Sequence, residues 1–191
     1  MNKEDIIEFF DGLAPKWDDM QVRKEDIINL ILDLGGISSG KKVLDVACGT
    51  GVLFPDYLAR GAEVVGIDIS PEMVKIAAEK YPQIKVICGD AHSDKFDETF
   101  DAVMVYNAFP HFINPRELFA NLSAHLNASG RLSVAHGLSE KELAECHSGS
   151  AEKVSQTLMS KENLAEIMSE FFDVDIMISD EKMYMVSGVK R

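Results

Sequence analysis

The segment from Val43 to Gly51, with the sequence VLDVACGTG, constrains the fold of this chain more than any other part of it. The apolar run 43–46 predicts a short buried strand, and Gly49 and Gly51 predict a tight turn after it. Apolar residues at helical spacing follow and predict a helix over 52–60. This order is typical of α/β proteins that bring their backbone against a nucleotide-like ligand, because glycine has no Cβ to block the approach.

The residue types in this turn favour a ligand other than a dinucleotide. Phe54 occupies the place of the third glycine in the dinucleotide fingerprint G-x-G-x-x-G. Asp45, inside the end of the strand, has no role in pyrophosphate binding, but it could pair with an ammonium group. The amides at the start of the helix could bind a carboxylate. A ligand with both an amine and a carboxylate therefore fits the turn better than a dinucleotide does.

From residue 41 onward, predicted strands and helices alternate, which indicates an α/β fold with a mostly parallel sheet and helices on both faces. Ser70-Pro71 and Asn114-Pro115 mark two helix starts, since each places a capping side chain before a proline. A turn over 179–182 leaves no room for a helix, so the last two strands should form an antiparallel hairpin. The expected strands are 42–46, 62–67, 84–88, 101–106, 131–136, 173–179 and 183–189, and the helices between them are 52–60, 71–80, 115–126 and 161–171.

The expected organisation is a single domain, 1–191, built on a Rossmann-like, doubly wound, seven-stranded sheet. Ser139 and Glu142 form a capping-box pattern that predicts a short helix near 140–147, in a segment that leaves a strand at the ligand-binding edge of the sheet. That segment is expected to be a lid. The four expected parts are an N-terminal helical cap (1–40, with helices over 3–13 and 24–34), a cofactor-binding core (41–136), the lid (137–160), and a C-terminal helix and hairpin (161–191).

Composition narrows the class of ligand and the compartment. The chain is 46% hydrophobic and 27% charged, as soluble globular proteins are, and its net charge of -13 disfavours a nucleic-acid partner. No apolar stretch approaches the roughly 20 residues that cross a bilayer, and no secretory leader is evident. Three scattered cysteines without a C-x-x-C pair suit a reducing compartment. We therefore expect a cytoplasmic monomer or homodimer with a small-molecule substrate and no membrane partner.

Four motifs in order carry a resemblance to a known family. They are Val43–Gly51, Ile67–Ser70, Gly89–Ala91 and Phe100–Tyr106. Together they resemble the class I S-adenosylmethionine-dependent methyltransferases, in particular the small type 11 group that includes enzymes of ubiquinone and menaquinone biosynthesis. Phe10–Asp18 is similar to the N-terminal segment that folds over the cofactor in that family. The resemblance covers the chain from about residue 5 and implies methyl transfer from S-adenosylmethionine to a small-molecule acceptor.

The resemblance also implies a role for each matching residue. Asp45 and the turn backbone would hold the methionine moiety, Asp68 would accept hydrogen bonds from the ribose hydroxyls, and Asp90 would accept the exocyclic amine of adenine. Trp17 would close the pocket, and Tyr106 would lie beside the sulfonium. The cofactor-binding residues implied in this way are Trp17, Asp45, Ala47, Cys48, Gly49, Gly51, Asp68, Ile69, Asp90, Ala91 and Asn107.

Three histidines could lie near the transferred methyl group. His111 follows strand 101–106, His136 ends strand 131–136, and His147 lies in the expected lid. Three interpretations stay open: a divalent-metal or metalloid site held by all three, a general base with hydrogen-bond donors to the substrate, or unrelated side chains at the rim of a cleft. His111 is the best single candidate for a catalytic residue, and Tyr106 is a further catalytic candidate beside it.

Two other functions also stay open. A nicotinamide-dependent oxidoreductase would share the fold, but Phe54 and Asp45 count against it. A protein that binds S-adenosylmethionine without transferring the methyl group would be expected to have lost the polar groups at the methyl end. This chain keeps Tyr106, Asn107 and His111 there.

Overall fold

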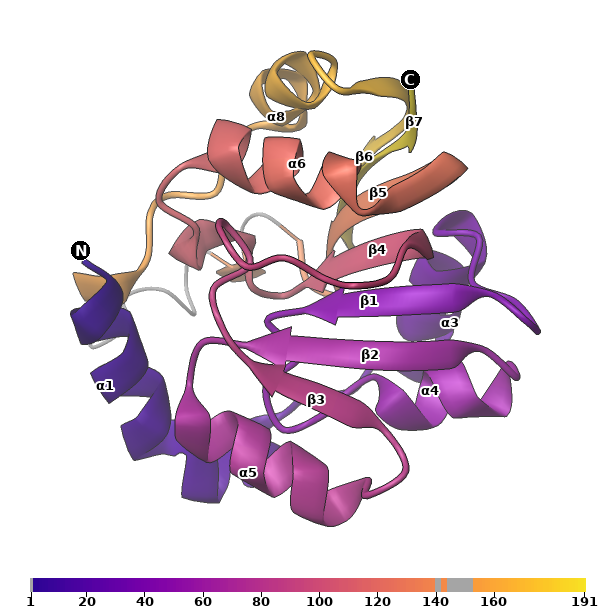
Figure 1. The fold of residues 1–191 in the computed structure, drawn as a ribbon. Helices are drawn as coiled ribbons and strands as arrows, with labels where there is room; N and C mark the ends of the chain where they lie inside the picture. Colours follow the sequence, from indigo (N-terminus) through magenta and orange to yellow (C-terminus); the bar gives the residue numbers. More distant parts are fainter. Residues whose placement is uncertain (1, 140–141, 144–152) are drawn as a thin grey trace.

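The computed structural model describes residues 2–139, 142–143 and 153–191, whose strands join in one seven-stranded sheet (Figure 1). The strands are β1 (Lys42–Val46), β2 (Glu63–Asp68), β3 (Lys85–Cys88), β4 (Phe100–Tyr106), β5 (Leu126–His136), β6 (Phe172–Ser179) and β7 (Tyr184–Lys190). The helices are α1 (Lys3–Leu13), η1 (Ala14–Lys16), α2 (Trp17–Met20), α3 (Glu25–Leu34), α4 (Phe54–Ala59), α5 (Pro71–Lys80), η2 (Phe109–His111), α6 (Pro115–Ala124) and α8 (Lys161–Met168).

The sheet has the order β3-β2-β1-β4-β5-β7-β6. The strands from β1 to β5 pair in parallel, and β7 lies antiparallel between β5 and β6. This confirms the predicted doubly wound, Rossmann-like fold with an antiparallel C-terminal hairpin. The chain reverses its direction of winding between β1 and β4, and open α/β sheets bind ligands outside the carboxyl ends of the strands at such a point. Figure 1 shows α1 at this edge, beyond the arrowheads of β2 and β3.

Each face of the sheet has its own apolar core, because successive side chains of a strand point to opposite faces. Leu44 and Val103 belong to the core that includes buried residues of α6 and α8. Val43 and Met104 belong to the core on the other face, with residues of α3 and α4. The two cores hold the strands in place, so the side chains at the strand ends have fixed positions.

The predicted helix starts at Pro71 and Pro115 are confirmed. The Ser70 hydroxyl accepts a hydrogen bond from the Met73 amide at 3.2 Å, and Asn114 caps α6 in the same way. The expected capping-box contact between Ser139 and Glu142 is also present. The helix predicted near 140–147, however, lies mostly outside the described residues. Among the helices that the structure does describe, none has the length and apolar character needed to cross a membrane.

The largest differences from the prediction lie in β5, in α4, around Trp17 and in α8, which ends at Met168 rather than at residue 171. β5 begins at Leu126 rather than at residue 131, because Ser129 adopts φ 63° and a register shift against β4 lets the strand continue through an apparent turn. α4 covers six residues rather than 52–60, since a turn closed by the hydrogen bond from the Phe54 amide to the Gly51 carbonyl precedes it. The residues around Trp17, which lie between the two helices predicted over 3–13 and 24–34, are helical as well, as η1 and α2.

Candidate functional site

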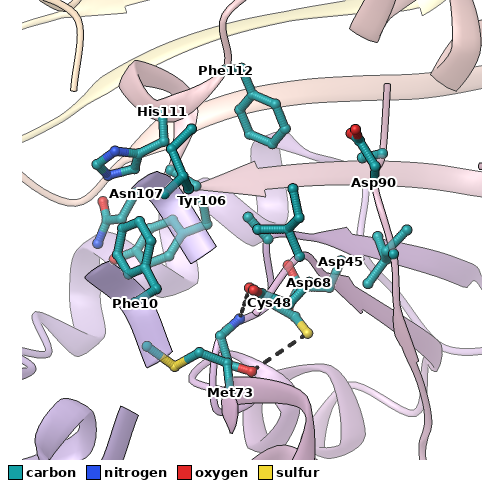
Figure 2. A pocket seen from close by; sticks show the side chains of 18 of the residues that line it. Phe10, Asp45, Cys48, Asp68, Met73, Asp90, Tyr106, Asn107, His111 and Phe112 are labelled. Carbon is teal, nitrogen blue, oxygen red and sulfur yellow. Dashed lines mark hydrogen bonds between the residues drawn. The ribbon is translucent and has the colours of Figure 1, made fainter. Parts of the chain in front are cut away.

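A cleft opens at the carboxyl edge of the sheet, beside the ends of β1, β2 and β4 (Figure 2). It holds about 1130 Å³ of empty space, the open solvent at its mouth included. Nearly all of the expected cofactor-binding residues meet there. Those that line the cleft, with the catalytic candidates, are Trp17, Asp45, Ala47, Cys48, Gly49, Asp68, Ile69, Asp90, Ala91, Tyr106, Asn107 and His111.

The turn after β1 presents its backbone to the cleft. Ala47 and Gly49 both have φ 55°, in the left-handed region. For alanine this conformation costs roughly 1–2 kcal/mol, so the surrounding structure must enforce it. A Cβ on Gly49 would lie 3.3 Å from Nε1 of Trp17, which closes over the turn. Residues 47–49 of the turn therefore form part of the cleft wall.

Gly51 is not among the residues that line the cleft, although the resemblance implied a binding role for it. It has φ 82°, and a Cβ there would lie 2.6 Å from Cδ2 of Phe54. Gly51 is needed because the turn packs against the first residue of α4. Gly51 contributes to the site indirectly, because it determines the path of the backbone around Gly49.

Gly51→Ala should lower the free energy of unfolding by more than the cost of placing an alanine at a left-handed φ. The variant combines an unfavourable φ, at about 1–3 kcal/mol, with a clash against Phe54. Gly36→Ala is the matched control, because Gly36 has φ 72° and no atom within 4 Å of its Cβ position. Urea denaturation of both variants makes the comparison. Equal losses in the two would show that the contact with Phe54 has no part in fixing the turn.

Asp68, at the tip of β2, is held in one orientation by two backbone amides. Its Oδ2 accepts a hydrogen bond from the Gly49 amide at 2.8 Å, and its Oδ1 accepts one from the Ser70 amide at 2.9 Å. Burial raises the pKa of Asp68, and these amides oppose that rise. Each carboxylate oxygen has a second acceptor position, so Asp68 can still accept hydrogen bonds from a ligand in the cleft.

Asp45 lies beside Asp68 and is also buried. Burial raises the pKa of Asp45 to about 8; the Tyr57 hydroxyl opposes the rise and the charge of Asp68 adds to it. At neutral pH the carboxyl is therefore mostly protonated. A cationic group placed next to it would favour the ionised form.

The opposite side of the cleft carries Asp90, whose carboxylate already has several partners. Its Oδ1 accepts hydrogen bonds from the amide and from Nδ1 of His92, both at 3.0 Å, and its Oδ2 pairs with Nζ of Lys3 at 3.1 Å. Burial opposes ionisation here, but the contacts with His92 and Lys3 prevail and lower the pKa of Asp90. Lys3 ties α1 to this end of the cleft.

Tyr106, Asn107 and His111 gather on the side of the cleft away from Asp90 (Figure 2). Burial raises the pKa of Tyr106 to about 12, so its hydroxyl is a neutral hydrogen-bond donor at physiological pH. Asn107 adopts φ 53°, and its Oδ1 accepts a hydrogen bond from the Gly137 amide at 3.0 Å. The left-handed backbone of Asn107 turns the chain at the end of β4 and sends it toward His111.

His111 has a defined orientation. Its Nδ1 lies 2.8 Å from the Val154 carbonyl oxygen, and because a carbonyl only accepts, Nδ1 is the donor. Nε2 is then the acceptor nitrogen of the neutral ring. The ring also packs edge-on against Phe10 of α1, with 4.9 Å between the centroids. The structure thus presents His111 as an oriented imidazole in the wall of the cleft.

The structure does not bring all three histidines to the cleft. His136 is fully buried and lies on the same face of β5 as Leu132 and Val134. Its ring packs against the ring of Tyr184, with 5.9 Å between the two centroids. It is absent from the cleft lining. His147 lies outside the described residues. Within those residues no group of three His, Cys, Asp or Glu side chains could hold a metal ion, so the three-histidine site stays an untested prediction.

The N-terminal helices close the cleft from outside, and sequence reasoning missed several of their contacts. Asp11 accepts a hydrogen bond from the Ser70 hydroxyl, and Asp18 accepts one from Thr50 and pairs with Lys80 at 2.6 Å. The resemblance of Phe10–Asp18 to a segment that folds over the cofactor indicated that this part of the chain covers the site, but it did not indicate the partners Ser70, Thr50 and Lys80. Lining residues that were not predicted include Lys3, Ile6, Gln21, Val52, Leu53, Met73, His92, Ala108, Phe112 and Ile113.

Residues 43–130 match the model of a family described as a methyltransferase domain. Among curated relatives, the demethylmenaquinone methyltransferase of Renibacterium salmoninarum is 32% identical over 142 residues, which are 69% of this chain and 58% of that protein. The demethylmenaquinone methyltransferase of Thermotoga maritima is 33% identical over 146 residues, 69% of this chain and 61% of that protein. The chain thus spans about three fifths of the length of these two relatives.

Solved structures share the fold along nearly the whole chain. One comes from the complex of the Haloferax volcanii Trm112 methyltransferase activator with a methyltransferase, with a TM-score of 0.78, 20% identity, and coverage of 95% of this chain and 97% of that one. Magnesium protoporphyrin IX methyltransferase from Synechocystis PCC 6803, solved with bound SAH, has a TM-score of 0.72 at 16% identity and full coverage of both chains.

Proposed function

Because this chain belongs to the class I S-adenosylmethionine-dependent methyltransferase family, we propose that it binds S-adenosylmethionine in the cleft and transfers the methyl group to a small-molecule acceptor. One observation supports this most: the glycine turn, Asp68 and Asp90, far apart in sequence, line the same cleft. These are the groups that an amino acid, a ribose and an adenine would need, in the order in which they are joined in the cofactor.

The residues present fit this cofactor. The backbone of residues 47–49 would lie against the methionine moiety, and Asp45 would face its ammonium group. Asp68 has acceptor positions left for the ribose hydroxyls, while Ile69 and Ala91 would lie against the adenine. When bound, S-adenosylmethionine supplies an electrophilic methyl group on its sulfonium.

The residues of the chain would then align the acceptor and remove its proton. We assign His111 as the general base, with Nε2 receiving the proton while Nδ1 stays bonded to the Val154 carbonyl. The Tyr106 hydroxyl, which burial keeps neutral, would donate a hydrogen bond to the acceptor. Phe10, which packs on His111, and Phe112, which lies between His111 and Asp90 in Figure 2, would exclude water.

The charges of the cleft point to the class of acceptor. Among the described residues that line it, the carboxylates are Asp45, Asp68 and Asp90, all assigned above to the cofactor, and the lysine, Lys3, pairs with Asp90. The side formed by Tyr106, Asn107, His111 and Phe10 carries aromatic and neutral polar groups instead (Figure 2). We therefore propose an acceptor that is apolar and uncharged at its reacting end, with one hydroxyl, amine or acidic carbon to methylate.

Removing the base should slow transfer without weakening cofactor binding. We expect His111→Ala to lower kcat about 10²–10⁴-fold, the usual contribution of a general base, with the Kd for S-adenosylhomocysteine changed less than about twofold. Turnover would be followed as S-adenosylhomocysteine formation against a panel of phenols, quinones, amines and thiols. His125→Ala is the control, because His125 packs on Phe96 and does not line the cleft. A wild-type rate in the His111 variant would refute the assignment.

A protein that binds the cofactor without transferring methyl is the other candidate. Tight binding of S-adenosylhomocysteine by the wild type, with no acceptor consumed across that panel, would favour it. The polar groups kept at Tyr106, Asn107 and His111 argue for transfer, since a binding protein has no need for an oriented imidazole there.

A further inference from the structure

The loop 89–95 carries Asp90, Ala91 and His92 into the cleft wall. A buried side-chain carboxamide of α6, that of Asn121, holds this loop from the side of the core. Asn121 is 5% exposed and lies on the apolar side of its helix, next to the core residues Leu118 and Leu122. Its Nδ2 donates to the carbonyl oxygens of Ala91 at 3.0 Å and of Asp94 at 2.9 Å, and its Oδ1 accepts from Nζ of Lys95 at 2.5 Å. A buried carboxamide on this face is costly unless it is fully bonded, and this one is.

The loop has a second support inside it. The carboxylate of Asp94 accepts a hydrogen bond from the Asp90 amide at 3.0 Å, and the amides of Ser93 and Asp94 donate back to the Asp90 carbonyl. A Cβ on Gly89 would collide with the Asp94 carboxylate, so the loop is closely packed at its start. Asn121 joins the middle of the loop to α6, whereas Lys3 of α1 pairs with the Asp90 carboxylate at its start.

We propose that Asn121 is a positioning residue for recognition of the adenine base. It sets the position of Ala91 and, through the loop, of Asp90, the groups assigned to the base. The inference rests on the proposed function, since it assumes that adenine lies at this end of the cleft. The consequence concerns selectivity: with the loop displaced, the site loses the hydrogen bond to the exocyclic amine before it loses the ribose and amino-acid contacts, which belong to β1 and β2.

The test compares two ligands that differ at the base. Affinities of S-adenosylhomocysteine and its inosyl analogue, in which an oxygen replaces the amine, would be measured by quenching of Trp17, which lines the cleft. We expect the wild type to prefer the adenosyl form by about tenfold or more. In Asn121→Ser the Kd for the adenosyl form should rise about tenfold and that for the inosyl form by about twofold or less, so the preference collapses.

Asn127→Ser is the matched control, because Asn127 donates to Asp101 at the opposite edge of the sheet. It should leave the preference unchanged. Hydrogen exchange in the unliganded Asn121 variant should be faster at residues 90–94 than in the wild type, which gives a readout independent of any ligand. Equal weakening of both ligands, or unchanged affinities, would reduce Asn121 to a structural residue. A wild type that binds neither ligand would instead refute the proposed function.

Discussion

Asp68→Ala should abolish measurable binding of S-adenosylhomocysteine, with the Kd raised about 100-fold or more. Each hydrogen bond from a ribose hydroxyl to the Asp68 carboxyl group contributes about 1–3 kcal/mol, and the substitution removes both. It also frees the amides of Gly49 and Ser70, which Asp68 now holds, so the turn that would bind the methionine moiety loses a support. Isothermal titration calorimetry of the variant makes the measurement.

The control for this variant is Asp101→Ala. Asp101 also accepts a backbone hydrogen bond, from the Lys42 amide at 2.9 Å, but it lies at the amino end of β4. Its loss should lower stability and leave affinity within about twofold, since distant sites act independently. Near-normal affinity in Asp68→Ala, with the protein folded, would mean that the adenosyl group does not depend on β2.

Binding of the cofactor product should release a proton, and the affinity should rise with pH. Asp45, with a pKa of about 8, is protonated in the unliganded protein at pH 6–7, and the ammonium group of the ligand favours its ionised form. Between pH 6 and pH 7 we expect the affinity of S-adenosylhomocysteine to increase about tenfold, the limit for one linked proton. Calorimetry in two buffers of different ionisation enthalpy counts the protons released.

Asp45→Asn should remove the pH dependence of the affinity for S-adenosylhomocysteine and weaken its binding. It should also stabilise the unliganded protein at alkaline pH. The pKa of Asp45 is higher in the folded protein than in the unfolded chain, so the wild type loses stability as the pH rises from about 4 through about 8. The asparagine variant has no such loss and should unfold at a higher temperature at pH 8.5. Proton release that persists in this variant would show that another group is linked to binding.

The cofactor side of the site could be predicted from sequence because its signals are local. Asp45, Gly49 and Asp68 each sit at the end of a short apolar run, and carboxyl ends of parallel strands meet at one edge of the sheet. The order of the four motifs along the chain then predicted that these residues lie in one site. Gly51 shows the limit of such reasoning, since its place in a tight turn was predicted but its contact with Phe54 was not.

The methyl side was harder to predict because it depends on which face of each strand meets which helix. His136 continues the face of Leu132 and Val134, and only the packing of α6 and α8 decides that this face lies away from the cleft. Lys3 and Phe112 reach the cleft through contacts between segments that are far apart in sequence. No short motif encodes such contacts.

The most direct test of the central claim is a crystal structure of the protein with S-adenosylhomocysteine. We expect the ribose hydroxyls within hydrogen-bonding distance of the Asp68 carboxylate, the amino-acid moiety on the backbone of Ala47–Gly49, and the adenine between Ile69 and Ala91. An adenosyl group bound anywhere else on the protein would contradict the proposed site, and a nicotinamide nucleotide bound in its place would contradict the proposed function.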